Sequence, residues 1–146
     1  MTLTIEANGK TDVGMVRSSN QDSILVRNEL NLFMVADGMG GHAGGEIASN
    51  ICVTEVEKSI KNSIKKIQEK SDHPNLAITA SLVEAINNAS TKIYERALEH
   101  TSLKGMGTTA TALKISDNFA YTAHVGDSRL YLVRCGFIYQ MTDDHS

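Results

Sequence analysis

The segment from Leu32 to Glu46, LFMVADGMGGHAGGE, constrains the fold more than any other part of the chain. It begins with an apolar run typical of a buried strand and ends in a pattern typical of the start of a long helix. The turn between them holds five glycines, one carboxylate, Asp37, and one histidine, His42. Glycine lets other groups approach the main chain closely, so the Asp37 carboxylate and the Gly38 carbonyl would be accessible at the rim of a sheet. Such oxygen atoms bind hard divalent cations, and we therefore predict a metal site here.

The preceding residues place a second carboxylate at the same rim. Ser23 to Val26 has the composition of a strand, residues 28–29 suit a turn, and residues 30–36 suit the partner strand. In an antiparallel hairpin of this kind, Asp22 and Asp37 lie at the same edge of the sheet. An Asp-Gly pair alone would also suit an ordinary strand-to-helix turn, so the metal interpretation depends on this convergence.

Two long helices are predicted in the middle of the chain. Apolar residues recur mostly every three or four positions from Gly44 to Lys66 and again from Leu76 to Glu99, so each helix has one apolar stripe. Pro74 lies between them, where it suits a turn or a first helical position. Because the connection is short, we expect the helices to lie antiparallel on one face of a sheet.

The remaining segments have strand-like patterns. Leu3 to Ala7 is the first candidate, and the later ones follow His100 with short turns between them. Strands linked this tightly predict an antiparallel meander. The later candidates cover residues 107–115, 119–125, 130–134 and 137–142.

Bulk properties favour a soluble domain in the cytoplasm. The chain has 146 residues, 41% hydrophobic and 21% charged, which suits one globular domain. A net charge of −3 does not indicate a surface for nucleic acid or an anionic membrane. Neither an export signal nor an apolar run of membrane-spanning length is visible, and the two cysteines have no metal-ligand spacing.

A third acid and one arginine suggest the chemistry. Asp127 follows Gly126 at a strand boundary, as Asp37 precedes Gly38. Clustered carboxylates repel one another unless a cation neutralises them, and oxygen ligands favour magnesium or manganese over zinc. Arg17 would supply a fixed forked donor for a phosphate. Clustered metal-binding carboxylates beside a phosphate-binding arginine are typical of metal-assisted hydrolysis of a phosphate ester, in which two ions activate a water.

Five ordered segments resemble the motifs of metal-dependent protein serine/threonine phosphatases, the PPM or type 2C family, in its bacterial form. The resemblance implies an α+β fold, an αββα sandwich of antiparallel sheets flanked by antiparallel helix pairs. It also implies hydrolysis of phosphoserine and phosphothreonine in proteins by a metal-activated water, with Mn²⁺ or Mg²⁺, in signalling with a Ser/Thr kinase. The segments are VGMVRSSNQD (13–22), VADGMGGH (35–42), GMGTT (105–109), VGDSR (125–129) and TDDHS (142–146).

The resemblance implies a role for each candidate residue. Arg17 is similar to the phosphate-binding arginine, and Asp22 to an acid that holds a metal directly or through water. Asp37 is similar to the carboxylate that bridges two central ions, and Gly38 to the residue whose carbonyl binds one of them. Asp127 is similar to the acid that serves an additional, weaker metal in bacterial members.

The general acid is less clearly matched. In some relatives a histidine directly follows the Asp-Gly pair, whereas Met39 stands there in this chain. The nearest histidine is His42, which is therefore the candidate catalytic residue beside Asp37.

The family pattern has two further metal aspartates beyond the matched segments, and this chain does not contain them. We therefore expect residues 1–146 to be the N-terminal part of one phosphatase domain, which would self-associate if truncated. Two other hypotheses are a non-catalytic phosphatase-like module that binds phosphoproteins or a kinase, and a phosphatase acting on an anti-sigma antagonist in a partner-switching cascade.

Overall fold

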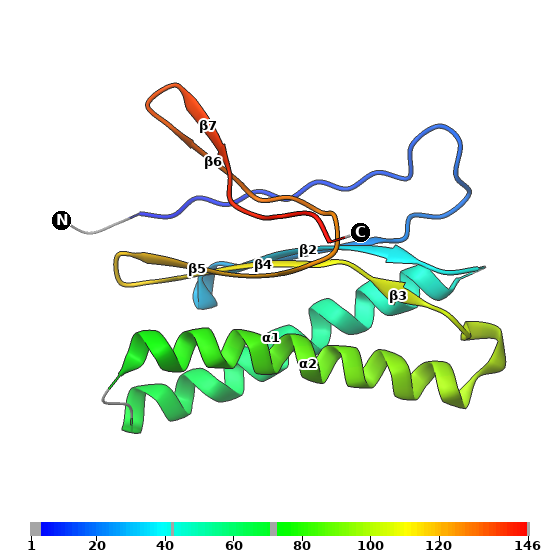
Figure 1. Cartoon of the computed structure of the whole chain (residues 1–146), viewed down its shortest axis with the longest axis horizontal. Coiled ribbons are helices and arrows are strands. Elements are labelled where there is room, and N and C mark those ends of the chain that lie inside the picture. The colour runs from blue at the N-terminus through cyan, green and yellow to red at the C-terminus, as the bar shows by residue number, and fades with distance from the viewer. Residues whose placement is uncertain (1–3, 42, 71–72, 146) are drawn as a thin grey trace.

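The computed structural model describes residues 4–41, 43–70 and 73–145. Its elements form layers, with a helix pair below a five-stranded sheet and a separate hairpin above it (Figure 1). The helices are α1 (Gly44–Lys70) and α2 (Pro74–Glu99), with short 3₁₀ turns η1 (Asn28–Leu30) and η2 (Thr101–Leu103). The strands are β1 (Asp22–Arg27), β2 (Leu32–Met39), β3 (Gly107–Thr108), β4 (Ala110–Ser116), β5 (Phe119–Val125), β6 (Tyr131–Arg134) and β7 (Phe137–Gln140).

The predicted hairpin is confirmed as β1 and β2. The two strands pair antiparallel, with Asp22 directly opposite Asp37. The chain reverses through η1 and Asn31, whose left-handed φ of 45° suits asparagine better than most residues. The hairpin therefore brings the two carboxylates to one edge of the sheet, as the sequence predicts.

The two predicted helices are also confirmed, and they lie antiparallel beneath the sheet (Figure 1). The first ends at Lys70 rather than Lys66, and Pro74 begins the second. The core forms where the helices meet β2 and β4, and Ala110 and Ala112 of β4 are small enough for close helix packing. Buried residues from the helices include Ala48, Val56, Ile60, Leu82, Ala85 and Ala89.

Two strand predictions are wrong. Residues 4–7 form no strand, and residues 5–10 instead lie against β1, β2 and β4, with Gly9 close to the Ile24 side chain. The meander ends at β5, because the turn after Val125, with Gly126 at a φ of 107°, redirects the chain away from the sheet. As a result, within the described residues β6 and β7 pair with each other and with no strand of the main sheet.

The α+β class with antiparallel sheets and an antiparallel helix pair is confirmed. The main sheet runs β1-β2-β4-β5, with β3 pairing to the end of β2. Among the described residues there is one helix pair of the expected αββα arrangement. Neither of these two helices is apolar enough over a sufficient length to cross a membrane.

Candidate active site

The junction between β2 and α1 is tightly packed around Gly38. This residue is buried, and its amide donates a 3.0 Å hydrogen bond to the Gln21 carbonyl. A side chain at Gly38 would overlap the Gly45 carbonyl at the start of α1. Only glycine therefore permits this approach, which fixes the end of β2, and with it Asp37, against the first turn of the helix.

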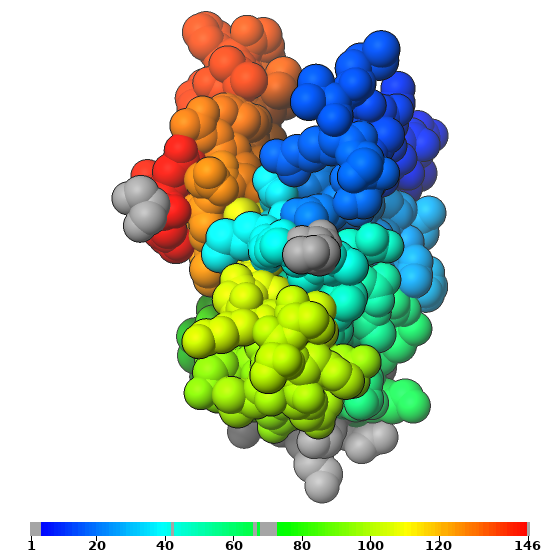
Figure 2. Space-filling model, turned by 90° about the vertical axis from the view of Figure 1, so that its right-hand side faces the viewer, coloured from blue at the N-terminus to red at the C-terminus, as the bar shows by residue number. Residues whose placement is uncertain are grey.

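A hollow of about 710 Å³ opens at this junction. Figure 2 shows its surroundings, with the loop before β1 (blue) and the segment after β5 (orange) on either side of the β2–α1 junction (cyan). Four predicted site residues line it, from three separate parts of the chain. The lining residues are Val16, Arg17, Ser18, Ser19, Gln21, Asp37, Gly38, Met39, Gly40, Thr109 and Asp127.

One predicted site residue that the structure describes, Asp22, is not in that lining. Asp22 lies directly opposite Asp37 in the hairpin, so its position supports the predicted convergence. His42 lies outside the described residues, and its role as general acid stays a prediction.

The charges of the site act on Asp37. Its pKa is raised, chiefly because partial burial disfavours a charged carboxylate, and next because of the charge of Asp22 and a side-chain hydrogen bond to it. Asp127 adds a smaller effect in the same direction, whereas the positive charge of Arg17 opposes it. The site thus combines three mutually repelling carboxylates with one guanidinium, an arrangement that a bound cation would relieve.

The donor atoms fit a hard divalent cation, because carboxylates and a main-chain carbonyl are its usual ligands. In the part of the chain that the structure describes, no group of three or more His, Cys, Asp or Glu side chains is close enough to hold an ion jointly. The structure therefore brings Arg17, Asp37, Gly38 and Asp127 to one hollow, with Asp22 beside Asp37, without forming a complete ligand cluster.

The sequence analysis did not single out Thr109, which the structure places inside the hollow. Its hydroxyl accepts a 2.9 Å hydrogen bond from the Asp37 amide and shares a 2.7 Å hydrogen bond with the Ser128 hydroxyl. The signal was present in the sequence, since Thr109 belongs to the GMGTT segment, but threonine is also an ordinary strand residue.

Residues after β7 hold the turn that carries Asp127. The Arg129 guanidinium forms a forked pair with the Asp144 carboxylate, with Nε and Nη2 distances of 2.8 and 2.6 Å. The His145 amide donates to the Gly126 carbonyl at 2.8 Å, and the His124 ring nitrogens bond Thr111 and the Asp143 carbonyl. Asp144 therefore supports the turn.

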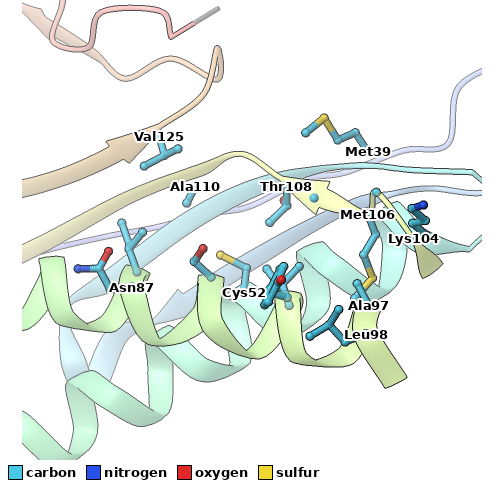
Figure 3. Close-up of a pocket in the computed structure, with 16 residues that line it drawn as sticks. Met39, Cys52, Asn87, Ala97, Leu98, Lys104, Met106, Thr108, Ala110 and Val125 are labelled. Atoms are coloured by element: carbon cyan, nitrogen blue, oxygen red, sulfur yellow. The ribbon is translucent and has the colours of Figure 1, made fainter. Parts of the chain in front are cut away.

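A second cavity, of about 680 Å³, lies between α2 and the ends of β3, β4 and β5 (Figure 3). Its lining is mostly apolar, and Met39 and Thr108 lie at its sheet side. The Cys52 thiol in this cavity is buried, which raises its pKa to about 11, so it is a poor nucleophile at neutral pH. Arg17, Asp37 and Asp127 line the other hollow.

Comparison with known proteins is consistent with the geometry of the first hollow. Residues 16–145 match the family model described as protein phosphatase 2C. The protein phosphatase PhpP of Streptococcus pneumoniae is 37% identical over 140 residues, which are 93% of this chain and 53% of PhpP.

Solved structures give the same result. The crystal structure of the serine/threonine phosphatase PstP/Ppp of Mycobacterium tuberculosis superposes with a TM-score of 0.79 at 35% identity, covering 92% of this chain and 52% of that one. A structure of the PstP catalytic domain in complex with two manganese ions superposes with a TM-score of 0.78 at 34% identity, covering 92% and 54%. The chain thus spans about half the length of these relatives. With motifs, fold and matched length in agreement, the chain belongs to the protein phosphatase 2C family.

Proposed function

We propose that this protein hydrolyses phosphoserine and phosphothreonine in other proteins, using Mn²⁺ or Mg²⁺. The observation that carries the proposal is that Arg17, Asp37 and Asp127, from three distant segments, line one hollow, with Asp22 paired to Asp37. The names of PhpP and PstP, and the two manganese ions of the PstP catalytic domain, support it.

Each residue has a distinct part in this proposal. Arg17 binds the phosphate of the substrate through its forked guanidinium. Asp37 would hold both central ions, the Gly38 carbonyl would hold one of them, Asp22 would hold one directly or through water, and Asp127 would serve a third. Bound ions of this kind supply an activated water and neutralise charge at the phosphate. His42 donates a proton to the departing serine or threonine oxygen.

The wider context is proposed in the same way. Residues 1–146 form the N-terminal part of one phosphatase domain, which is supported by coverage of 52–55% in several relatives. The substrates are targets of a Ser/Thr kinase in the cytoplasm, neither nucleic acid nor membrane is a partner, and the 146-residue chain alone self-associates. The many exposed apolar residues of β6 and β7 support the last point.

The test is release of inorganic phosphate from a phosphothreonine peptide, measured with Mn²⁺ and the purified complete phosphatase domain, of which residues 1–146 are the proposed N-terminal part. We expect release that a chelator abolishes and that Asp37→Asn removes. Glu84→Gln, an exposed change on α2, should leave the rate unchanged. Binding of the peptide without release of phosphate would instead indicate a non-catalytic module.

A further inference from the structure

Thr109 links Asp37, near the end of β2, to the turn after β5 that carries Asp127. It lies between β3 and β4, where its amide donates a 2.9 Å hydrogen bond to the Asp37 carbonyl. Its hydroxyl accepts a 2.9 Å hydrogen bond from the Asp37 amide. Both backbone groups of Asp37 are therefore held by this one residue.

The same side chain holds the turn that carries Asp127. The Thr109 hydroxyl shares a 2.7 Å hydrogen bond with the Ser128 hydroxyl. Gly126 packs against the rest of the side chain, since an added Cβ there would lie 2.6 Å from the Thr109 methyl and 2.8 Å from its Cβ. Thr109 thus contacts the residues on both sides of Asp127.

The contacts between Thr109 and Asp37 lie between two paired stretches of β2, because the pairing of β2 with β3 begins at Gly38. The paired register of β2 with β4 stops at Val35, two residues before Asp37. The register of β4 with β5 stops at Val125, two residues before Asp127. Because β4 lies between β2 and β5 in the sheet, the two carboxylates have no direct strand pairing to fix their separation.

We propose that Thr109 is a positioning residue, whose hydroxyl sets the separation of the Asp37 and Asp127 carboxylates for cation binding. Thr109 contacts neither the cation nor the substrate in this role. It acts through the Asp37 backbone and through Ser128. The inference rests on the proposed function only in assigning these carboxylates to a divalent cation, so it is tested by Mn²⁺ binding and not by turnover.

The test compares Thr109→Val, which keeps the shape and removes the hydroxyl, with Thr109→Ser, which keeps the hydroxyl. Mn²⁺ dissociation constants are measured by titration calorimetry in the purified protein. We expect Thr109→Val to weaken Mn²⁺ binding about 10–100-fold, as the loss of groups that orient metal ligands does, and Thr109→Ser to stay within about 3-fold of wild type.

Thr111→Val is the matched control. Thr111 is buried on the adjacent strand β4, and its hydroxyl bonds the His124 ring at 2.9 Å and the Ser128 carbonyl at 3.5 Å, but it makes none of the hydrogen bonds to Asp37 that Thr109 makes. We expect this variant to lose stability while keeping Mn²⁺ affinity. Equal weakening by Thr111→Val and Thr109→Val would overturn the proposal, because the effect would then reflect general destabilisation.

A second variant keeps the test decisive if Thr109→Val does not fold. Ser128→Ala removes only the hydroxyl link between Thr109 and the turn, and should weaken Mn²⁺ binding by a smaller factor than Thr109→Val. Unchanged Mn²⁺ affinity in Ser128→Ala would refute the role, whether or not Thr109→Val folds. Normal Mn²⁺ affinities in wild type without phosphate release would refute the proposed function and leave this comparison valid.

Discussion

Asp37 and Asp22 face each other on the β1–β2 hairpin, so two negative charges oppose one another when the site holds no cation. Like charges placed directly opposite destabilise a strand pair by roughly 0.2–1 kcal/mol. The site therefore costs stability in the metal-free protein, in the manner of other sites whose charges are arranged for binding.

We predict that Asp37→Asn raises the free energy of unfolding of the metal-free protein by roughly 0.2–1 kcal/mol, since it removes one of the two opposed charges. The same change should abolish Mn²⁺-dependent phosphate release and weaken Mn²⁺ binding. Urea unfolding in the presence of a chelator measures the first effect, with Glu84→Gln as the control. A less stable metal-free variant would contradict the repulsion between the carboxylates.

Arg17 should act through binding of the substrate. Arg17 lines the hollow together with Asp37, and its forked guanidinium suits the oxygens of a phosphate. We predict that Arg17→Ala raises KM for a phosphopeptide more than it lowers kcat, because a contact made in the ground state is mainly uniform binding. Steady-state kinetics decide this, and a large loss of kcat with KM unchanged would assign Arg17 to the transition state instead.

At the scale of the elements, the β2–α1 junction is tightly constrained by close main-chain contacts. Gly38 has the Gly45 carbonyl and the Gln21 carbonyl so close that no Cβ fits beside them. Gly41, three residues later, has open space at the corresponding position. These two glycines offer a matched pair of substitutions within one turn.

We predict that Gly38→Ala destabilises the protein by more than the roughly 1–3 kcal/mol of ordinary overpacking, because the obstructing atoms belong to the main chain. Gly41→Ala should change the free energy of unfolding by about 0.5 kcal/mol or less, as surface substitutions usually do. Thermal unfolding of both variants is the measurement. Equal stability of the two variants would show that the junction relaxes easily.

The strand β4 carries a buried lysine on the side facing the helices. Lys114 is 7% exposed, and its ammonium donates a 2.7 Å hydrogen bond to the Ile115 carbonyl. Burial lowers its pKa, with Asp117 opposing the shift. A lowered pKa in the folded state means that the charged form destabilises the fold at neutral pH. This penalty decreases as the pH rises through the folded pKa towards the unfolded value of about 10.4.

Lys114→Met should therefore raise the melting temperature at pH 7, and its advantage over wild type should shrink as the pH approaches about 10.4. Thermal unfolding at a series of pH values gives this comparison. Lys58→Met, an exposed change on α1, should show no such dependence. An advantage for Lys114→Met that is constant with pH would assign the effect to packing alone.

At the scale of the whole molecule, the layers and the site were predictable to different degrees. The hairpin and both helices follow from apolar periodicity, and the position of Asp22 opposite Asp37 follows from the hairpin alone. The pairing of β6 with β7 follows from the predicted meander, but the separation of this pair from the main sheet does not. Leu132, Val133, Phe137 and Ile138 are apolar on both faces, so their pattern does not indicate which sheet they join.

Two further differences have local causes. Residues 3–7 alternate between apolar and polar side chains, as a strand does. Residues 5–10 nevertheless lie across the face of the sheet and are not paired as a strand. Thr109 was missed because its role depends on the ends of two strand pairs that lie far apart in the sequence. Hydrophobic periodicity predicts individual helices and strands, whereas the path of residues 5–10 and the role of Thr109 depend on contacts between elements.

The central claim is that Arg17, Asp22, Asp37 and Asp127 form one metal and phosphate site. The most direct measurement is an anomalous difference map from crystals of the natural full-length protein grown with Mn²⁺. We predict manganese peaks within bonding distance of the Asp37 carboxylate and the Gly38 carbonyl, on the hollow that Arg17 and Asp127 line. Ordered manganese at other positions, with these carboxylates unliganded in a catalytically active protein, would contradict the account.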